Sequence, residues 1–225
     1  MNWQAIALSL KLAVCVAAIL LAAGLPIAYW ITFSRWRWKF VVEAIVALPL
    51  VLPPTVLGYY ILVGLGPRHF AGQAWQSLFG RALPFTFGGL LVASVLYSLP
   101  FAVQPFAAGF EAVDRRVIEA AWTLGASPMA AFFRVILPLS AAGGLATGIV
   151  LSFAHTIGEF GVVLMVGGNI PGVTRTVSID IYDQAQSGNY GAANATAFVL
   201  LVFSFIVLSV VYGANRRALS VWRRN

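Results

Sequence analysis

The amino-acid sequence predicts an all-α integral membrane protein, folded as one domain of about five membrane-spanning helices. Its 225 residues are 60% hydrophobic and only 9% charged, whereas soluble domains carry about 25% charged residues. Apolar runs long enough to cross a bilayer core, about 20 residues each, recur between short polar segments. The expected spans are residues 8–33, 40–65, 85–106, 139–166 and 192–212.

The positive charge of the chain is a topology signal. Ten of its 14 Lys and Arg residues fall in three segments that share one side of the membrane if the spans alternate. The positive-inside rule makes that side the cytoplasm, with the amino end outside and the carboxyl end inside. A nucleic-acid partner is not expected. The three segments hold Arg35, Arg37 and Lys39; Arg115, Arg116 and Arg134; and Arg216, Arg217, Arg223 and Arg224.

The first span is free of charge from residue 12 to residue 33. The second is interrupted by Pro49, Pro53 and Pro54, which remove backbone donors at membrane depth. Broken backbone is tolerated there only where neighbouring helices or a water-filled cavity satisfy the freed carbonyls. The prolines therefore favour a discontinuous helix that lines a pathway, the alternative being a kinked helix that serves packing alone.

The fourth span is expected to begin at Pro138, because proline cannot sit inside the preceding helix. Gly144 and Gly148 form a small-residue stripe that favours close contact with another span or with a second copy of the chain. The apolar run continues to Val166, so a straight helix would reach about 42 Å, well beyond a core of about 30 Å. A break is expected at Gly158–Gly161. Residues 66–83 and 167–191 are expected to be external loops.

A polar face leads up to that break. Ser152, His155, Thr156 and Glu159 lie at helical spacings of three and four. An ionisable residue in a membrane span is costly and usually marks a functional site. Glu159 either lines or gates a path, or it is a structural lock paired with a basic residue or with freed backbone donors. His155 is either a donor that lines a cavity or the partner of Glu159.

The segment from about residue 108 to residue 138 is amphipathic and lies between long apolar runs. Arg115–Leu124 can form a first short helix, with Gly125 at the left-handed position that ends it. Ser127 and Pro128 are typical of an N-cap and first helical residue, and they start a second helix that runs to Leu137. The small residues Ala120 and Ala121 allow another backbone to approach. The segment is either a docking surface or an interfacial hairpin without a partner.

The same segment resembles a known signature. Glu119-Ala120-Ala121, three residues, Gly125, nine residues and Val135-Ile-Leu-Pro138 are similar to the cytoplasmic motif of binding-protein-dependent ABC importer permeases, which usually have Ile where this chain has Val135. The resemblance implies a type I ABC importer permease fold in a bacterial inner membrane, with residues 108–138 as its coupling loop. It also implies that Glu119, Ala120, Ala121 and Gly125 contact an ATP-binding subunit.

Further stretches refine the resemblance. Gly158–Gly161 after Ser152-Phe-Ala resembles permeases for tetrahedral oxyanions, and residues 49–60 and 168–176 are most similar to those for molybdate. This implies a homodimer, two copies of a cytoplasmic ATP-binding subunit that use ATP and Mg²⁺, and a periplasmic molybdate-binding protein. A sulfate-type permease is the alternative within the family, and tungstate is an alternative substrate.

Three absences limit the other classes of function. The sequence has no Walker-type phosphate loop, no Cys-rich or His-rich metal motif and no serine-nucleophile elbow. The chain is therefore expected to have no catalytic residues and to bind no cofactor or metal itself. A membrane-embedded enzyme that uses Glu159 and His155 would still lack a second catalytic group, and a passive channel would not require a docking surface.

Overall fold

The computed structural model describes the backbone of residues 1–222, and all of its regular elements are helices. Arg223 and Arg224, which were predicted to extend the cytoplasmic basic cluster, lie outside the described residues. In chain order the helices are α1 (Trp3–Phe33), α2 (Lys39–Val51), α3 (Pro54–Gly64), α4 (Phe70–Phe79), α5 (Phe87–Glu111), α6 (Arg115–Thr123), α7 (Pro128–Ala131), the π-helical η1 (Phe132–Ile136), α8 (Leu137–Ser140), the π-helical η2 (Ala141–Leu145), α9 (Ala146–Gly158), α10 (Gly161–Gly167), α11 (Val177–Gln186) and α12 (Tyr190–Trp222).

Within the described residues, α1, α5 and α12 are each long and apolar enough to cross a membrane. Two bent pairs bring the count to five if each pair is one span: α2 with α3, bent by 114°, and Pro128–Ser140 with Gly143–Gly158, bent by 69°. The predicted all-helical membrane fold is confirmed. The segments 66–83 and 167–191 were expected to be loops, but each contains a helix, α4 in the first and α11 in the second.

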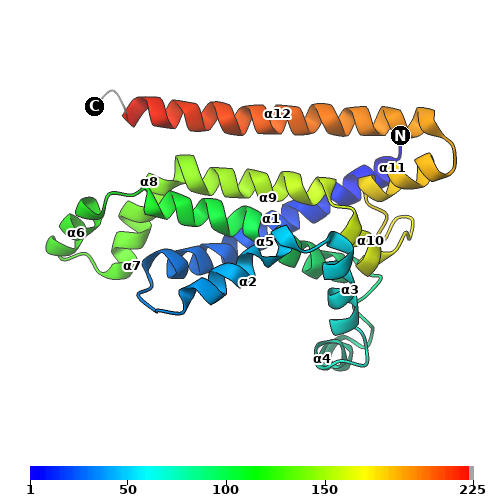
Figure 1. Ribbon diagram of the computed structural model, residues 1–225, viewed down its shortest axis with the longest axis horizontal. Helices are drawn as coiled ribbons and strands as arrows, with labels where there is room; N and C mark the ends of the chain where they lie inside the picture. The colour runs from blue at the N-terminus through cyan, green and yellow to red at the C-terminus, as the bar shows by residue number, and fades with distance from the viewer. Residues whose placement is uncertain (223–225) are drawn as a thin grey trace.

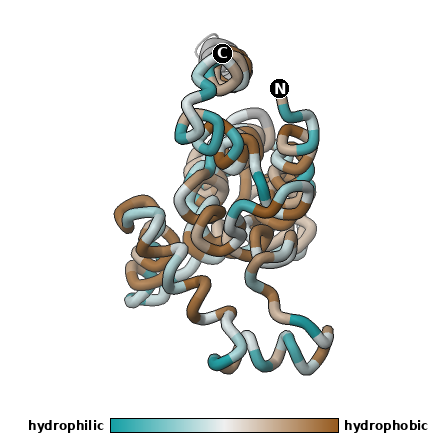
Figure 2. The backbone as a smooth tube through the Cα atoms, turned by 90° about the vertical axis from the view of Figure 1, so that its right-hand side faces the viewer, coloured by the Kyte–Doolittle hydropathy of each residue, from teal (hydrophilic) through white to brown (hydrophobic). Residues whose placement is uncertain are grey.

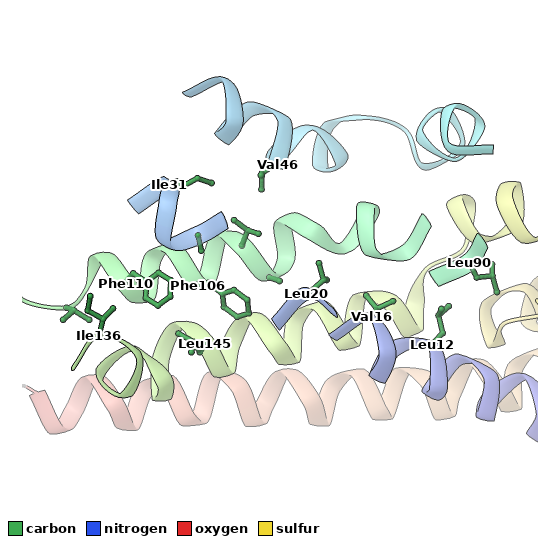
Figure 3. Packing of buried hydrophobic residues seen from close by; sticks show 14 of the residues in the cluster. Leu12, Val16, Leu20, Ile31, Val46, Leu90, Phe106, Phe110, Ile136 and Leu145 are labelled. Carbon is green, nitrogen blue, oxygen red and sulfur yellow. The ribbon is translucent and has the colours of Figure 1, made fainter. Parts of the chain in front are cut away.

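The core lies where α1, α5 and α9 pack against one another (Figure 1). Leu20 of α1 and Phe106 of α5 are fully buried there, and Ile136 and Leu145 extend the cluster toward the α6 end (Figure 3). α12 runs along the outside of this layer and keeps most of its apolar side chains exposed. Figure 2 shows hydrophobic residues along most of the tube, as expected when lipid covers the outer surface.

The two ends of the molecule carry different elements (Figure 1). The loop between α1 and α2 lies at the same end as α6 and α7, while the amino terminus lies at the opposite end with α10 and α11. The basic residues at 35–39 and at 115–116 therefore share one end, as the alternation of spans predicted.

Pro138 does not start a separate helix as predicted. The helical path is continuous from Pro128 to Gly158, because η1 widens the turn before the proline. There the Leu137 N–H donates to the carbonyl of Phe132, five residues back. A π turn relieves the clash that a proline ring makes with the preceding turn of an α-helix.

The glycine stripe packs within the chain. A Cβ atom built on Gly144 would lie 2.4 Å from Gly109 Cα of α5, and one built on Gly148 would lie 2.5 Å from the Phe106 ring. The stripe was predicted to contact either another span or a second copy of the chain, and in the structure it contacts another span, α5.

Candidate functional site

The two breaks predicted from the sequence meet in space. α2 ends at Val51, Leu52 is extended because a proline follows it, and Pro54 opens α3. α9 ends at Gly158, and Glu159 is extended before α10 begins at Gly161.

Glycines let α3 and α10 pack closely at this point. A Cβ atom on Gly161 would lie 2.7 Å from Pro54 Cβ, and one on Gly58 would lie 2.8 Å from Met165 Cβ. Both separations are far shorter than ordinary carbon–carbon contacts of about 3.5–4.0 Å. The broken second span and the broken fourth span are therefore joined through their half-helices.

A pocket of about 580 Å³ opens beside this junction. Pro54, His155 and Glu159, all predicted for the path, line it, whereas Pro49, Pro53, Ser152 and Thr156 do not. The remaining lining residues are Thr55, Tyr97, Ala154, Gly158, Phe160, Gly161, Leu164 and Met165.

His155 is held by α5. Its Nδ1 atom lies 2.9 Å from the Ser98 hydroxyl, and its ring stacks on Phe101 with ring centroids 3.8 Å apart. The Tyr97 ring packs on it as well, at 4.8 Å. Of the two hypotheses for His155, the structure supports the cavity-lining one; its hydrogen bond is to Ser98 and not to Glu159.

Ser152 and Thr156 are turned into the packing. Both are almost completely buried. Ser152 donates to the carbonyl of Ile149, and Thr156 donates to the carbonyl of Ser152 and also lies 3.0 Å from the Ser98 hydroxyl. The predicted polar face is thus divided, with two residues at the pocket and two in the contact with α5.

Glu159 is 3% exposed, and neither carboxyl oxygen has a hydrogen-bond partner among the described residues. Ser94 and Tyr97 of α5 are close enough to interact with the carboxyl electrostatically, and among the described residues the buried Ser94 hydroxyl makes no hydrogen bond of normal geometry. In the described part of the chain the ion pairs are Lys39–Glu43 and Arg175–Asp183, so no basic residue reaches Glu159 there. The lock hypothesis required either a basic residue or freed backbone donors as partner, and neither is found among the described residues, whereas the hypothesis that Glu159 lines or gates the path requires none.

A second surface lies at the opposite end, on α6 and α7. Asp114 caps α6 by accepting from the Arg116 N–H at 2.9 Å. Gly125 is left-handed with φ +84°, and Ser127 caps α7 by accepting from the Ala130 N–H at 3.2 Å. The predicted turn at Gly125 and the predicted cap at Ser127 are therefore present, and Asp114 is a cap that was not predicted from the sequence.

The side chains of this surface are open to solvent. Glu119, Ala120, Gly125, Ser127 and Pro128 are exposed, and Ala121 is half-buried. Leu124 is 88% exposed and Trp122 is 50% exposed. An apolar patch outside the membrane-spanning region is typical of a protein–protein contact. We call the residues Glu119–Pro128 the coupling surface.

Sequence reasoning missed the contribution of α5 to the pocket. Ser94, Tyr97 and Ser98 lie within the expected span 85–106, and none of the three was predicted to lie at the path. Their spacing of three and four residues places them on one helical face, and this is the signal that was available.

Comparisons with known proteins agree with this architecture. Residues 10–220 match the family described as binding-protein-dependent transport system inner membrane component. The chain is 52% identical over 212 residues to the molybdenum transport system permease protein ModB of Azotobacter vinelandii, covering 94% of this chain and 93% of that protein.

More distant similarities show how far the fold extends. The sulfate transport system permease protein CysT of Escherichia coli is 35% identical over 186 residues, covering 82% of this chain and 66% of that protein. A solved structure of the MetNI methionine ABC transporter in inward-facing conformations matches with a TM-score of 0.67 at 16% identity, covering 98% of this chain and 96% of that one. The predicted family is confirmed: the chain belongs to the binding-protein-dependent transport system inner membrane components, the permeases of ABC importers.

Proposed function

We propose that this chain is the permease subunit of an ATP-driven importer that moves molybdate across the bacterial inner membrane by alternating access. The observation that carries the proposal is the 52% identity to a molybdenum transport permease over nearly the full length of both chains. Tungstate, a tetrahedral oxyanion of the same charge, is expected to follow the same route.

The path is proposed to pass the pocket at the junction of α3 and α10. A volume of about 580 Å³ is ample for one hydrated tetrahedral oxyanion. The ring of His155, the hydroxyl of Thr55 and the phenol of Tyr97 offer hydrogen-bonding groups at its wall. The carboxyl of Glu159 is a poor ligand for an anion, so we assign it to the gate and not to binding.

The driving subunits are proposed to bind the coupling surface. Its exposed small residues let another backbone approach, and its exposed apolar side chains supply area to bury. Two ATP-binding subunits, which hold ATP and Mg²⁺, would act on a homodimer of this chain. The coupling surface would then face the cytoplasm and the amino end the outside, where a molybdate-binding protein delivers the anion.

The test is ATP-dependent uptake in proteoliposomes that contain this chain, its ATP-binding subunit and its external binding protein. Labelled molybdate is supplied with excess sulfate or tungstate. Uptake that resists sulfate and yields to tungstate supports the proposal. Strong competition by sulfate would show that the substrate belongs to the sulfate class. The absence of uptake of any oxyanion would overturn the proposal.

A further inference from the structure

Helix α11 has no role in the path or in the coupling surface, yet its first turn is tied both to the amino-terminal segment and to the break at Glu159. The Val177 N–H donates to the Ser9 hydroxyl of α1 at 2.8 Å. Asp180 accepts from the Asn2 side chain at 2.8 Å. The Ser178 hydroxyl donates to the backbone carbonyl of Glu159. Asp180 and Ser9 are each 2% exposed, so these are interior contacts.

The bond from Ser178 satisfies a carbonyl that the break sets free. Glu159 is extended, so its carbonyl lies outside the regular ladder of α9. An unpaired carbonyl at membrane depth is costly. Because the Ser178 proton is used on this carbonyl, the Thr176 hydroxyl, 3.0 Å away, must be the donor to Ser178. Thr176 is buried, so the Ser178 hydroxyl is held in one orientation.

A second contact reaches the next residue of the break. The ring of Tyr182, one turn further along α11, packs against the Phe160 ring with centroids 4.9 Å apart. Glu159 and Phe160 both line the pocket. α11 therefore holds both residues that separate α9 from α10.

The loop before α11 is braced to the same helix. Arg175 donates to the Asn169 side chain at 2.6 Å and pairs with Asp183 at 3.6 Å, and Asn169 also donates to Asp183 at 3.0 Å. The tip of this loop remains open, with Ile170 39% exposed and Val173 43% exposed. The two ends of the open tip are thus joined to each other and to α11 by polar contacts.

The opposite side of α11 has room for movement. A cavity of about 610 Å³ lies beside Asp180, between the amino end of α1 and the start of α12. A shift of α11 toward this cavity would draw on the Ser178 bond and displace the Glu159 carbonyl.

We propose that α11 transmits contact at the outer loop 168–176 to the pocket, with Ser178 as the residue that positions Glu159. The proposal rests on the function proposed above, because the contact is that of the external binding protein. Ser178 itself touches no substrate. Its role is to couple the movement of the outer loop 168–176 to that of Glu159 at the break between α9 and α10.

The transport arm of the test uses the complete reconstituted importer. Basal ATPase activity is measured without binding protein, and stimulated activity with loaded binding protein. Ser178→Ala is expected to lower the stimulated rate at least fivefold while the basal rate stays within twofold. Ser178→Thr, which keeps a hydroxyl, is expected to restore stimulation. Ser187→Ala is the matched control, because it removes a serine hydroxyl that bonds only within α11, to the Asp183 carbonyl.

A second arm does not depend on transport. Hydrogen–deuterium exchange of residues 158–163 is measured in the isolated permease in nanodiscs, and Ser178→Ala is expected to speed it at least tenfold, while Ser187→Ala leaves it unchanged. Full stimulation in Ser178→Ala, an equal fall in basal and stimulated rates, or unchanged exchange would each overturn the inference. A wild-type importer that its binding protein does not stimulate would count against the proposed function, and the exchange arm would still decide whether Ser178 holds the break.

Discussion

Substituting Gly144 by Ala should destabilise the fold through a backbone collision. The added Cβ would lie 2.4 Å from Gly109 Cα and 2.4 Å from the Pro105 carbonyl oxygen. The first separation is about 1 Å short of an ordinary carbon–carbon contact of about 3.5 Å. Both obstacles are backbone atoms, so a change of side-chain rotamer does not relieve them, and η2 and α5 must separate.

Overpacking of this kind costs about 1–3 kcal/mol. Because the contact is backbone against backbone, we expect about 2–3 kcal/mol, which lowers the folded-to-unfolded ratio by a factor of about 30 to 150. The measurement is unfolding of the purified chain in mixed micelles with rising SDS fraction, followed by tryptophan fluorescence.

Gly143→Ala is the matched control. It changes the adjacent glycine of η2, where an added Cβ meets no atom within 4 Å. Alanine is favoured over glycine in a helix by about 1 kcal/mol, so this variant should be as stable as the parent or slightly more stable. If Gly144→Ala unfolded at the same SDS fraction as Gly143→Ala, the close crossing of η2 and α5 would be refuted.

Three further outcomes are expected. Gly125→Asp should abolish ATP-dependent uptake, because it places a charged side chain on the coupling surface. The amount of chain in the membrane should stay normal, because the added Cβ meets no atom within 4 Å and only the φ of +84° is strained. Gly188→Asp, with φ +75° and equally open space, is the control and should transport normally. Ser98→Ala should lower the free energy of unfolding by about 1–3 kcal/mol, since it leaves His155 Nδ1 without its partner; an unchanged unfolding midpoint would contradict the pocket geometry. Glu159→Gln should raise the melting temperature of the isolated permease, because a side chain that cannot ionise is cheaper to bury than a carboxyl group that has to give up its charge on folding, and a lower melting temperature would point to a partner for Glu159.

Much of the local structure was predictable because it depends on neighbours in sequence. The left-handed Gly125 and the Ser127 cap follow from the residues that occupy those positions. The breaks at Pro53 and at Gly158–Gly161 follow from the missing backbone donors and from the length of the apolar run.

The site itself was only partly predictable, because it depends on which elements meet. Nothing in the spacing of Pro54 and Glu159 indicates that their two breaks form one junction. The partner of His155 is Ser98, 57 residues away in the sequence. α4 was missed because of the mixed polarity of residues 66–83, and α11 was missed because of the turn residues and the charges in residues 167–191, two of which, Asp180 and Asp183, lie inside the helix. Pro138 was misplaced because the π turn of η1 depends on packing and not on propensity.

The two π-helical segments η1 and η2 lie between the coupling surface and the pocket. A π turn holds one residue more than an α turn, and one residue corresponds to about 100° of rotation and 1.5 Å of rise. Converting either segment to α geometry would therefore rotate α9 about its own axis, and at η2, where the path bends by 69°, it would also change the direction of α9. A change of helical winding in η1 or η2 would therefore move His155 relative to the pocket. A displacement of the coupling surface could reach the pocket in this way without a rigid-body movement of the whole helix.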